Sequence, residues 1–204
     1  MASLALTVGL SFGLGSLAAR WAHSGLDRAI ETASLAAQAA PNFWLGLVGI
    51  LIFSRDLKWL PSFGRGDLWH LVLPAVTLSV QFIGVLTRLV RAGVVEMSGQ
   101  DFARTARAKG LTEVRVLVHH IYRNMLIPVV TMIGLQLGTL VGGVVVTETV
   151  FAWPGLGRLI VTAIENRDYP LVQAAVVFTA VIFVLTNLVV DVAYAYLDPR
   201  IRYR

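Results

Sequence analysis

The sequence contains no cysteine and few charged residues, and both deficits narrow the classes of protein to which it can belong. Without Cys, the chain of 204 residues has no disulfide, no thiolate metal site and no cysteine nucleophile. Charged residues make up only 14% of the chain and hydrophobic residues 56%, whereas soluble domains contain about 25% and about 45–50%. A phosphate-binding loop of the G-x-x-x-x-G-K-S/T type is also missing from the sequence. We therefore expect an all-α integral membrane protein that does not bind ATP through such a loop.

Five segments are apolar enough to cross a bilayer, because a transmembrane helix needs roughly 20 mostly apolar residues. They cover approximately residues 1–19, 30–53, 71–90, 126–151 and 171–197. The first of them has no basic residue before its apolar stretch, and Arg20 follows it, so we interpret it as a span and not as a signal peptide. The sequence thus predicts a polytopic helical bundle that forms a single domain over residues 1–204.

The basic residues divide unequally between the two sides of this predicted bundle. The loops after the first and third spans and the C-terminal tail contain 12 Lys and Arg residues, and the opposite loops contain 5. Basic residues concentrate in cytoplasmic loops, which predicts a cytoplasmic C-terminus and an external Met1. The same distribution explains the net charge of +5 without a nucleic-acid partner. Because an external start without a signal is unusual, we expect that one further span precedes Met1, so that the chain is shortened from six spans.

The longest polar connection, about residues 94–124, carries clear helical signals. Residues 102–109 read as two helical turns rich in Ala and Arg, with Asp101 as the N-cap and Gly110 as a left-handed residue after the last turn. Thr112 is the expected N-cap of a second helix that leads into the next span. An apolar stripe is predicted along this second helix, formed by Val114, Leu117, Val118, Ile121 and Met125. A basic helix on the membrane surface is one interpretation, but two short capped helices are more typical of docking into a groove of another protein.

This connection resembles the cytoplasmic loop of the permease subunits of ABC importers, in the form found in the dipeptide, oligopeptide and nickel group. The matching motifs are DFARTARAKGL at 101–111, RNMLIP at 123–128, ETVFAWPGLGRL at 148–159, RDYP at 167–170 and LDPR at 197–200. The general importer loop begins Glu-Ala-Ala, whereas this chain has Arg104-Thr105-Ala106, as the peptide group does. The resemblance covers nearly the whole chain, and its specificity lies in the order and spacing of the motifs.

The resemblance implies a binding-protein-dependent inner-membrane component that translocates dipeptides, oligopeptides or nickel across a bacterial-type inner membrane. Its implied partners are ATP-binding subunits, a second homologous permease subunit, an extracytoplasmic substrate-binding protein and membrane lipid. ATP hydrolysis then belongs to another chain, and this subunit needs no cofactor and is not itself an enzyme. The residues implied to couple the loop to the ATP-binding subunit are Asp101, Arg104, Thr105, Ala106, Lys109, Gly110 and Leu111.

Four further residues are candidates for gating or for lining the pathway. Glu148 lies near the outer end of an apolar span, where a carboxylate costs roughly 2.5–3.5 kcal/mol unless it faces protein or water. Pro154 and Gly155 form a turn just after that span, a short helix is expected over residues 159–165, and Asp168 can start the final span. Gln136 is polar enough to line a pathway and equally suited to hydrogen bonds between helices. For Glu148 a structural role is favoured over contact with a substrate.

One other class of function fits the sequence less well. An ion-driven secondary transporter would need broken helices and paired intramembrane ionisable groups, and Glu148 and Asp191 are too few and too far apart. This transporter remains the alternative to the ABC permease. The four histidines have no acidic or histidine partner at the spacing of metal ligands, so no metal site is expected.

Overall fold

The computed structural model describes residues 2–197, including their side chains except those of residues 137–143, 190, 191 and 193–197. Within these residues the elements are helices joined by turns. The side chain of Asp191 and the tail beyond Leu197, both of which entered the sequence predictions, lie outside the described part.

The elements in chain order are α1 (Ala2–Arg20), α2 (Gly25–Ala39), α3 (Asn42–Gly49), the π-helix η1 (Ile50–Asp56), α4 (Trp69–Ser98), α5 (Asp101–Ala108), α6 (Glu113–Arg115), the π-helix η2 (Val116–Ile121), α7 (Tyr122–Val150), α8 (Leu156–Glu165) and α9 (Tyr169–Leu197).

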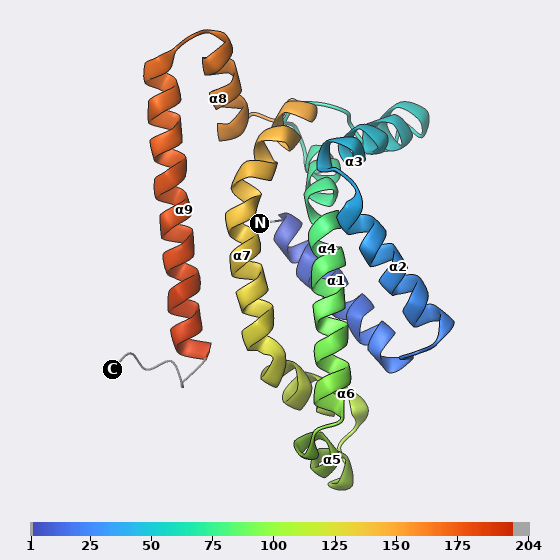
Figure 1. Cartoon of the computed structure of the whole chain (residues 1–204). Coiled ribbons are helices and arrows are strands. Elements are labelled where there is room, and N and C mark those ends of the chain that lie inside the picture. The colour runs from blue at the N-terminus through green and yellow to red at the C-terminus, as the bar shows by residue number, and fades with distance from the viewer. Residues whose placement is uncertain (1, 198–204) are drawn as a thin grey trace.

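Helix α4 lies at the centre of the bundle, and α1, α2 and α7 pack against it (Figure 1). Helix α9 packs against α7 and α8 and leaves most of its surface exposed. Within the described residues, four helical stretches are long and apolar enough to cross a membrane, or five if a bent pair of helices is counted as one span. The predicted all-α membrane bundle is therefore confirmed.

The predicted span over residues 30–53 is not one straight helix, because the chain bends there by 103° between α2 and α3. Pro41 causes the bend. A proline disfavours the helical conformation of the residue before it, and Ala40 accordingly adopts an extended conformation with φ −76° and ψ 126°. As a result, α2 runs along α4, whereas α3 and η1 project sideways at the end of the bundle (Figure 1).

The bundle has two distinct ends (Figure 1). The turn between α1 and α2 lies at the same end as α5, and α9 runs back towards that end. The arm formed by α3 and η1 lies at the opposite end, together with α8. Loops that the charge distribution assigned to one side of the membrane therefore share one end of the molecule.

Small residues allow α1 and α2 to approach α4 closely. A Cβ atom on Gly15 would lie 2.8 Å from the Thr87 carbonyl oxygen, and one on Gly84 would overlap with the backbone of α2. The Ser79 hydroxyl lies within hydrogen-bond distance of two carbonyl oxygens, that of Ser3 in α1 at 3.0 Å and that of Ala75 in its own helix, and it shares its proton between them. Close backbone packing and such interhelical hydrogen bonds are typical of membrane bundles.

Candidate functional site

Helix α5 occupies the position that the sequence predicted, with its first residue shifted by one. Gln100 is the N-cap, with φ −76° and ψ 155°, and its side chain makes no capping hydrogen bond. The prediction that Asp101 is the N-cap is therefore wrong. Asp101 is the first helical residue, where its negative charge still interacts favourably with the N-terminal end of the helix dipole.

Gly110 ends α5 in the left-handed conformation that the sequence predicted, with φ +79°. Its N–H donates to the Arg107 carbonyl oxygen at 2.9 Å, and the Leu111 N–H donates to the Ala106 carbonyl oxygen at 3.3 Å. These two bonds form a Schellman motif, which satisfies the last carbonyl groups of a helix and reverses the chain. The space beside Gly110 is open, since no atom lies within 4 Å of the position that a Cβ would take.

The two faces of α5 have different environments. Ala103 and Ala106 are buried and pack into an apolar cluster with the end of α4 and with η2 and α7. Leu111 is half-buried against the same cluster. The remaining residues of the predicted coupling set are exposed, namely Asp101, Arg104, Thr105, Lys109 and Gly110. The predicted set thus divides into an exposed surface and the alanine face that attaches this surface to the bundle.

The predicted apolar stripe of the second helix is correct for Leu117, Ile121 and Met125, which pack into the apolar cluster, and wrong for Val114 and Val118. Val114 is 72% exposed and Val118 is 47% exposed, whereas Val116, Ile121 and Met125 are buried. The reason is the π-helical turn η2, in which hydrogen bonds span five residues. Residues five apart, such as Val116 and Ile121, therefore share the buried face. The turn is continuous with α6 before it and α7 after it, so the predicted continuity between the loop and the span is confirmed.

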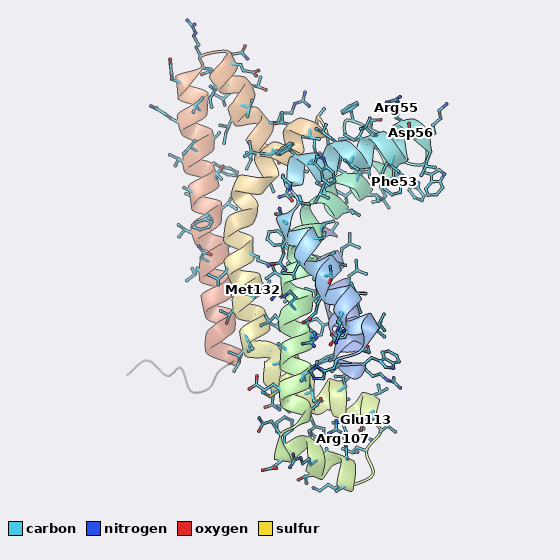
Figure 2. All side chains as sticks on the ribbon, turned by 45° about the vertical axis from the view of Figure 1, so that its right-hand side comes forward. Phe53, Arg55, Asp56, Arg107, Glu113 and Met132 are labelled. Carbon is cyan, nitrogen blue, oxygen red and sulfur yellow. The ribbon has the colours of Figure 1, made fainter. Side chains whose placement is uncertain are left out.

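An ion pair connects α5 to α6 across the Gly110 turn. Arg107 Nε lies 2.8 Å from Glu113 Oε1, and the same guanidinium donates to the Ser98 carbonyl oxygen at 3.0 Å. Figure 2 shows both side chains pointing towards one another at the tip of the molecule. Because the two groups are largely exposed, the pair contributes little to stability. It restrains the angle between the two helices.

The start of α7 is fastened to α1 by Tyr122. Its hydroxyl lies 2.6 Å from Ser16 Oγ, and its ring stacks edge-on against Phe12 with 4.9 Å between the centroids. The hydroxyl–hydroxyl bond and the aromatic pair both stabilise this contact. The segment that leaves the loop is therefore anchored to a second helix of the bundle.

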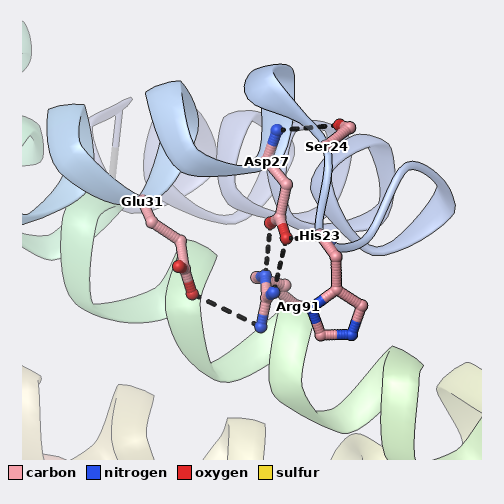
Figure 3. Close-up of polar contacts among 5 residues, drawn as sticks. All are labelled: His23, Ser24, Asp27, Glu31 and Arg91. Carbon is pink, nitrogen blue, oxygen red and sulfur yellow. Dashed lines mark hydrogen bonds and ion pairs between the residues drawn. The ribbon is translucent and has the colours of Figure 1, made fainter.

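A buried ion pair near the same end of the bundle was missed by the sequence analysis (Figure 3). Asp27 at the start of α2 is 2% exposed. It accepts two hydrogen bonds from Arg91 of α4, at 2.5 Å from Nε and 2.6 Å from the second terminal nitrogen. Glu31 lies 3.3 Å from the same guanidinium, and the His23 backbone N–H donates to Asp27 at 2.8 Å. Such bidentate pairing is strong and directional, and it holds the turn between α1 and α2 on α4.

One local signal for this pair was present in the sequence. Ser24 and Asp27 form an S-x-x-D pattern, which is typical of the start of a helix. The structure bears this out, because the Ser24 hydroxyl accepts a hydrogen bond from the Asp27 N–H at 3.3 Å. The pattern locates Asp27 but does not identify Arg91, which lies 64 residues further along the chain.

The candidate gating residues divide between two places. Glu148, Pro154 and Gly155 come together at the end of α7, where the Glu148 carboxylate accepts a hydrogen bond from the Arg158 backbone N–H at 3.0 Å. Arg158 is the third residue of α8, so Glu148 caps this helix from outside and faces the positive end of its dipole. Gln136 lies twelve residues earlier in α7, about 18 Å along the helix axis.

Gly155 leaves room for this capping arrangement, because a Cβ there would overlap with the Glu148 carboxylate. We expect Gly155→Ala to displace the carboxylate and to cost about 1.5–3 kcal/mol, the value of a hydrogen bond to a charged group. Thermal unfolding in detergent measures this loss. Gly25→Ala is the control, since Gly25 also lies at the start of a helix and no atom lies within 4 Å of the added Cβ. Equal stability of the two variants would contradict the capping role of Glu148.

The final span begins as the sequence predicted. Asp168 Oδ1 accepts a hydrogen bond from the Leu171 N–H at 3.1 Å, which caps the first turn of α9. The turn that contains Pro154 and Gly155 and the short helix after it are also present, although α8 begins at Leu156, three residues earlier than expected. Local turn and capping residues were sufficient for both predictions.

Comparisons with known proteins agree on one kind of protein. The family model for a binding-protein-dependent transport system inner membrane component matches residues 11–203. The chain is 46% identical over 195 residues to the glutathione transport system permease protein GsiC of Escherichia coli strain K12, covering 95% of this chain and 64% of that protein. The corresponding protein of Salmonella choleraesuis is 45% identical over 202 residues, covering 99% of this chain and 66% of the relative. The chain thus spans slightly less than two thirds of the length of these relatives.

The fold also has a counterpart among solved structures. A chain of the inward-facing MetNI methionine ABC transporter superposes with a TM-score of 0.72 and 19% sequence identity. The match covers 97% of this chain and 93% of that one. At this identity the likeness concerns the fold alone.

Proposed function

The chain belongs to the family of binding-protein-dependent transport system inner membrane components, and from this membership we propose that it is a translocation subunit of an ATP-driven importer. The proposed partners are ATP-binding subunits, a second homologous permease subunit and an extracytoplasmic substrate-binding protein. The proposed location is a bacterial-type inner membrane, with α5 and the C-terminus in the cytoplasm. ATP hydrolysis takes place on the ATP-binding subunits, so the chain itself acts as a permease and not as an enzyme.

The observation that carries the proposal is the exposed face of α5 with the Gly110 turn. This surface projects from one end of the bundle (Figure 1), and its exposed residues include two basic side chains, Arg104 and Lys109. Its buried face packs on α4 and η2. We propose that a groove of the ATP-binding subunit receives the exposed face, in the manner of a helix bound in a groove.

The mechanism follows from how α5 is connected. When the ATP-binding subunits close, they pull on the exposed face of α5. Helix α5 packs on the end of α4, and an ion pair joins it to α6. Helix α6 continues without interruption into η2 and α7. Motion of α5 is therefore passed to α4 and α7, while the Asp27–Arg91 pair carries α2 along with α4. ATP changes the conformation because docking differs in free energy between the inward- and outward-facing states.

The proposed substrates are dipeptides or oligopeptides, with nickel as the other substrate of the resembling group. The E. coli relative is named as a glutathione permease, and glutathione is itself a tripeptide. A peptide substrate fits both this name and the Arg104-Thr105-Ala106 form of the loop. The binding protein, which is a separate chain, sets most of the selectivity in this proposal.

Uptake into vesicles tests the proposed function against the ion-driven alternative. The chain is reconstituted with its neighbouring ATP-binding and permease subunits, and uptake of tritiated glutathione and of a tritiated dipeptide is followed in the presence of the binding protein. We expect uptake to require ATP and to survive ionophores that collapse ion gradients. Uptake without ATP that ionophores abolish would favour the secondary transporter.

The proposed orientation is tested by labelling single cysteines in intact cells, since the chain has none of its own. Arg65 and Thr112 are both exposed and lie towards opposite ends of the bundle. We expect an impermeant thiol reagent to modify Arg65→Cys from outside and to modify Thr112→Cys only after the cells are opened. Modification of Thr112→Cys in intact cells would reverse the topology and exclude a cytoplasmic α5.

A further inference from the structure

A groove of about 390 Å³ lies on α4 between α2 and α7. Gln81, Phe82 and Val85 of α4 form its floor, Gln38 of α2 forms one wall, and Met132 and Gln136 of α7 form the other. Met132 lies near mid-height of the bundle (Figure 2). Three carboxamides from three different helices therefore meet in one groove well away from either end.

The carboxamide of Gln81 is held in place by the bend at Pro41. Its Nε2 donates a hydrogen bond to the Ala40 carbonyl oxygen at 2.7 Å. Helix α2 ends at Ala39, so this carbonyl belongs to the break between α2 and α3, and inside a bilayer such a group must find a partner within the protein. Gln38 is similarly oriented by a bond of 3.2 Å from its Nε2 to the Ser34 carbonyl oxygen.

Three of the lining residues are carboxamides, the others are apolar, and none is charged. A carboxamide offers two N–H donors and an acceptor oxygen, so one bond to the backbone leaves Gln38 and Gln81 with further hydrogen-bonding capacity towards the groove. Polar side chains at the depth of a bilayer face the protein interior or a water-filled path and not lipid. Neutral donors and acceptors match the peptide groups of a substrate without holding either of its charged ends.

We propose that this groove is a subsite of the translocation pathway, where the backbone amides of a peptide form transient hydrogen bonds with Gln81 and Gln136. The inference rests on the proposed function and adds to it a place and a chemistry for substrate contact. Conduction requires binding that is weak enough for release, and uncharged carboxamides meet that requirement. Carboxamides suit hydrogen bonding to a peptide amide better than coordination of a nickel ion, which prefers imidazole nitrogen.

Thiol accessibility in the assembled transporter tests whether the groove faces water. Met132→Cys is compared with Val177→Cys, which lies on the outer surface of α9 and is 62% exposed in the chain alone. We expect a charged methanethiosulfonate to modify Met132→Cys several-fold faster than Val177→Cys, and saturating transported peptide to slow that modification. A rate for Met132→Cys equal to or below that of the control would overturn the inference, because the groove would then be covered by lipid or by the second permease subunit.

Substitution of Gln136 tests the chemistry of contact. Gln136→Leu is expected to raise the KM for uptake of tritiated glutathione or a tritiated dipeptide several-fold. Gln136→Asn, which keeps the carboxamide, is expected to recover part of the loss. Unchanged KM in Gln136→Leu would remove the proposed contact and leave the ATP-driven importer intact. If the parent transporter takes up neither peptide, the peptide function itself fails, and the accessibility of Met132→Cys still decides whether the groove belongs to a pathway.

Discussion

Arg91→Ala is expected to lower the unfolding temperature of the protein in detergent by roughly 10 °C. The substitution leaves the Asp27 carboxylate buried without the guanidinium that supplies two of its hydrogen bonds. An unpaired buried charge is costly, because neither water nor another cation replaces the lost partner. The turn between α1 and α2 would then separate from α4, and thermal unfolding followed by circular dichroism measures the loss.

Two comparison variants identify the cause of this loss. Arg88→Ala removes an exposed arginine one turn earlier on the same helix, and we expect it to change the unfolding temperature little. The double variant Asp27→Leu/Arg91→Met replaces the pair by apolar side chains and is expected to recover most of the stability, since the buried charge is removed together with its partner. A double variant as unstable as Arg91→Ala would show that the loss comes from packing and not from the unpaired charge.

Gly110→Val is expected to uncouple ATP hydrolysis from uptake while leaving membrane insertion intact. Gly110 has φ +79°, and a β-branched residue in this conformation costs about 1–2 kcal/mol. The added side chain would also project into the open space beside the turn, on the surface proposed to dock with the ATP-binding subunit. We expect weaker co-purification of that subunit, or normal co-purification with ATPase activity that substrate no longer stimulates.

Gly64→Val is the matched control for backbone strain. Gly64 has a similar φ of +85° and equally open surroundings, but it lies in the loop before α4, where its N–H donates to the Phe151 carbonyl oxygen at 2.9 Å. The two variants therefore carry the same strain at opposite ends of the bundle. We expect Gly64→Val to retain co-purification of the ATP-binding subunit and substrate-stimulated ATPase activity. Equal behaviour of the two variants would mean that the Gly110 turn has no special part in coupling.

The features that were predicted correctly from the sequence depend on neighbouring residues. Gly110 ends α5 because of its own conformational freedom, and Asp168 caps α9 through the N–H of a residue three positions later. Such signals are contained within one or two helical turns. The short helix α5 and the turn before α8 were therefore recognisable without knowledge of the fold.

The features that were missed depend on contacts between distant segments. Arg91 was counted only as one of the basic residues on the cytoplasmic side, because its partner Asp27 lies 64 positions away. The π-helical turn η2 changed the buried face of the loop, and no residue type in the sequence marks it. The presence of a proline did not by itself show where a helix is interrupted, because Pro41 breaks a helix whereas Pro74 and Pro128 lie inside α4 and α7.

Site-specific photo-cross-linking is the most direct test of the claim that the ATP-binding subunit acts on this chain by docking on α5. The photoreactive amino acid p-benzoylphenylalanine replaces Arg104, whose side chain is 72% exposed on α5, or Arg65 in the loop at the opposite end as a control. After irradiation of the transporter assembled in its membrane, we expect a covalent adduct with the ATP-binding subunit from position 104 and none from position 65. An adduct from position 65, or none from position 104 in a transporter that still takes up substrate, would contradict the claim.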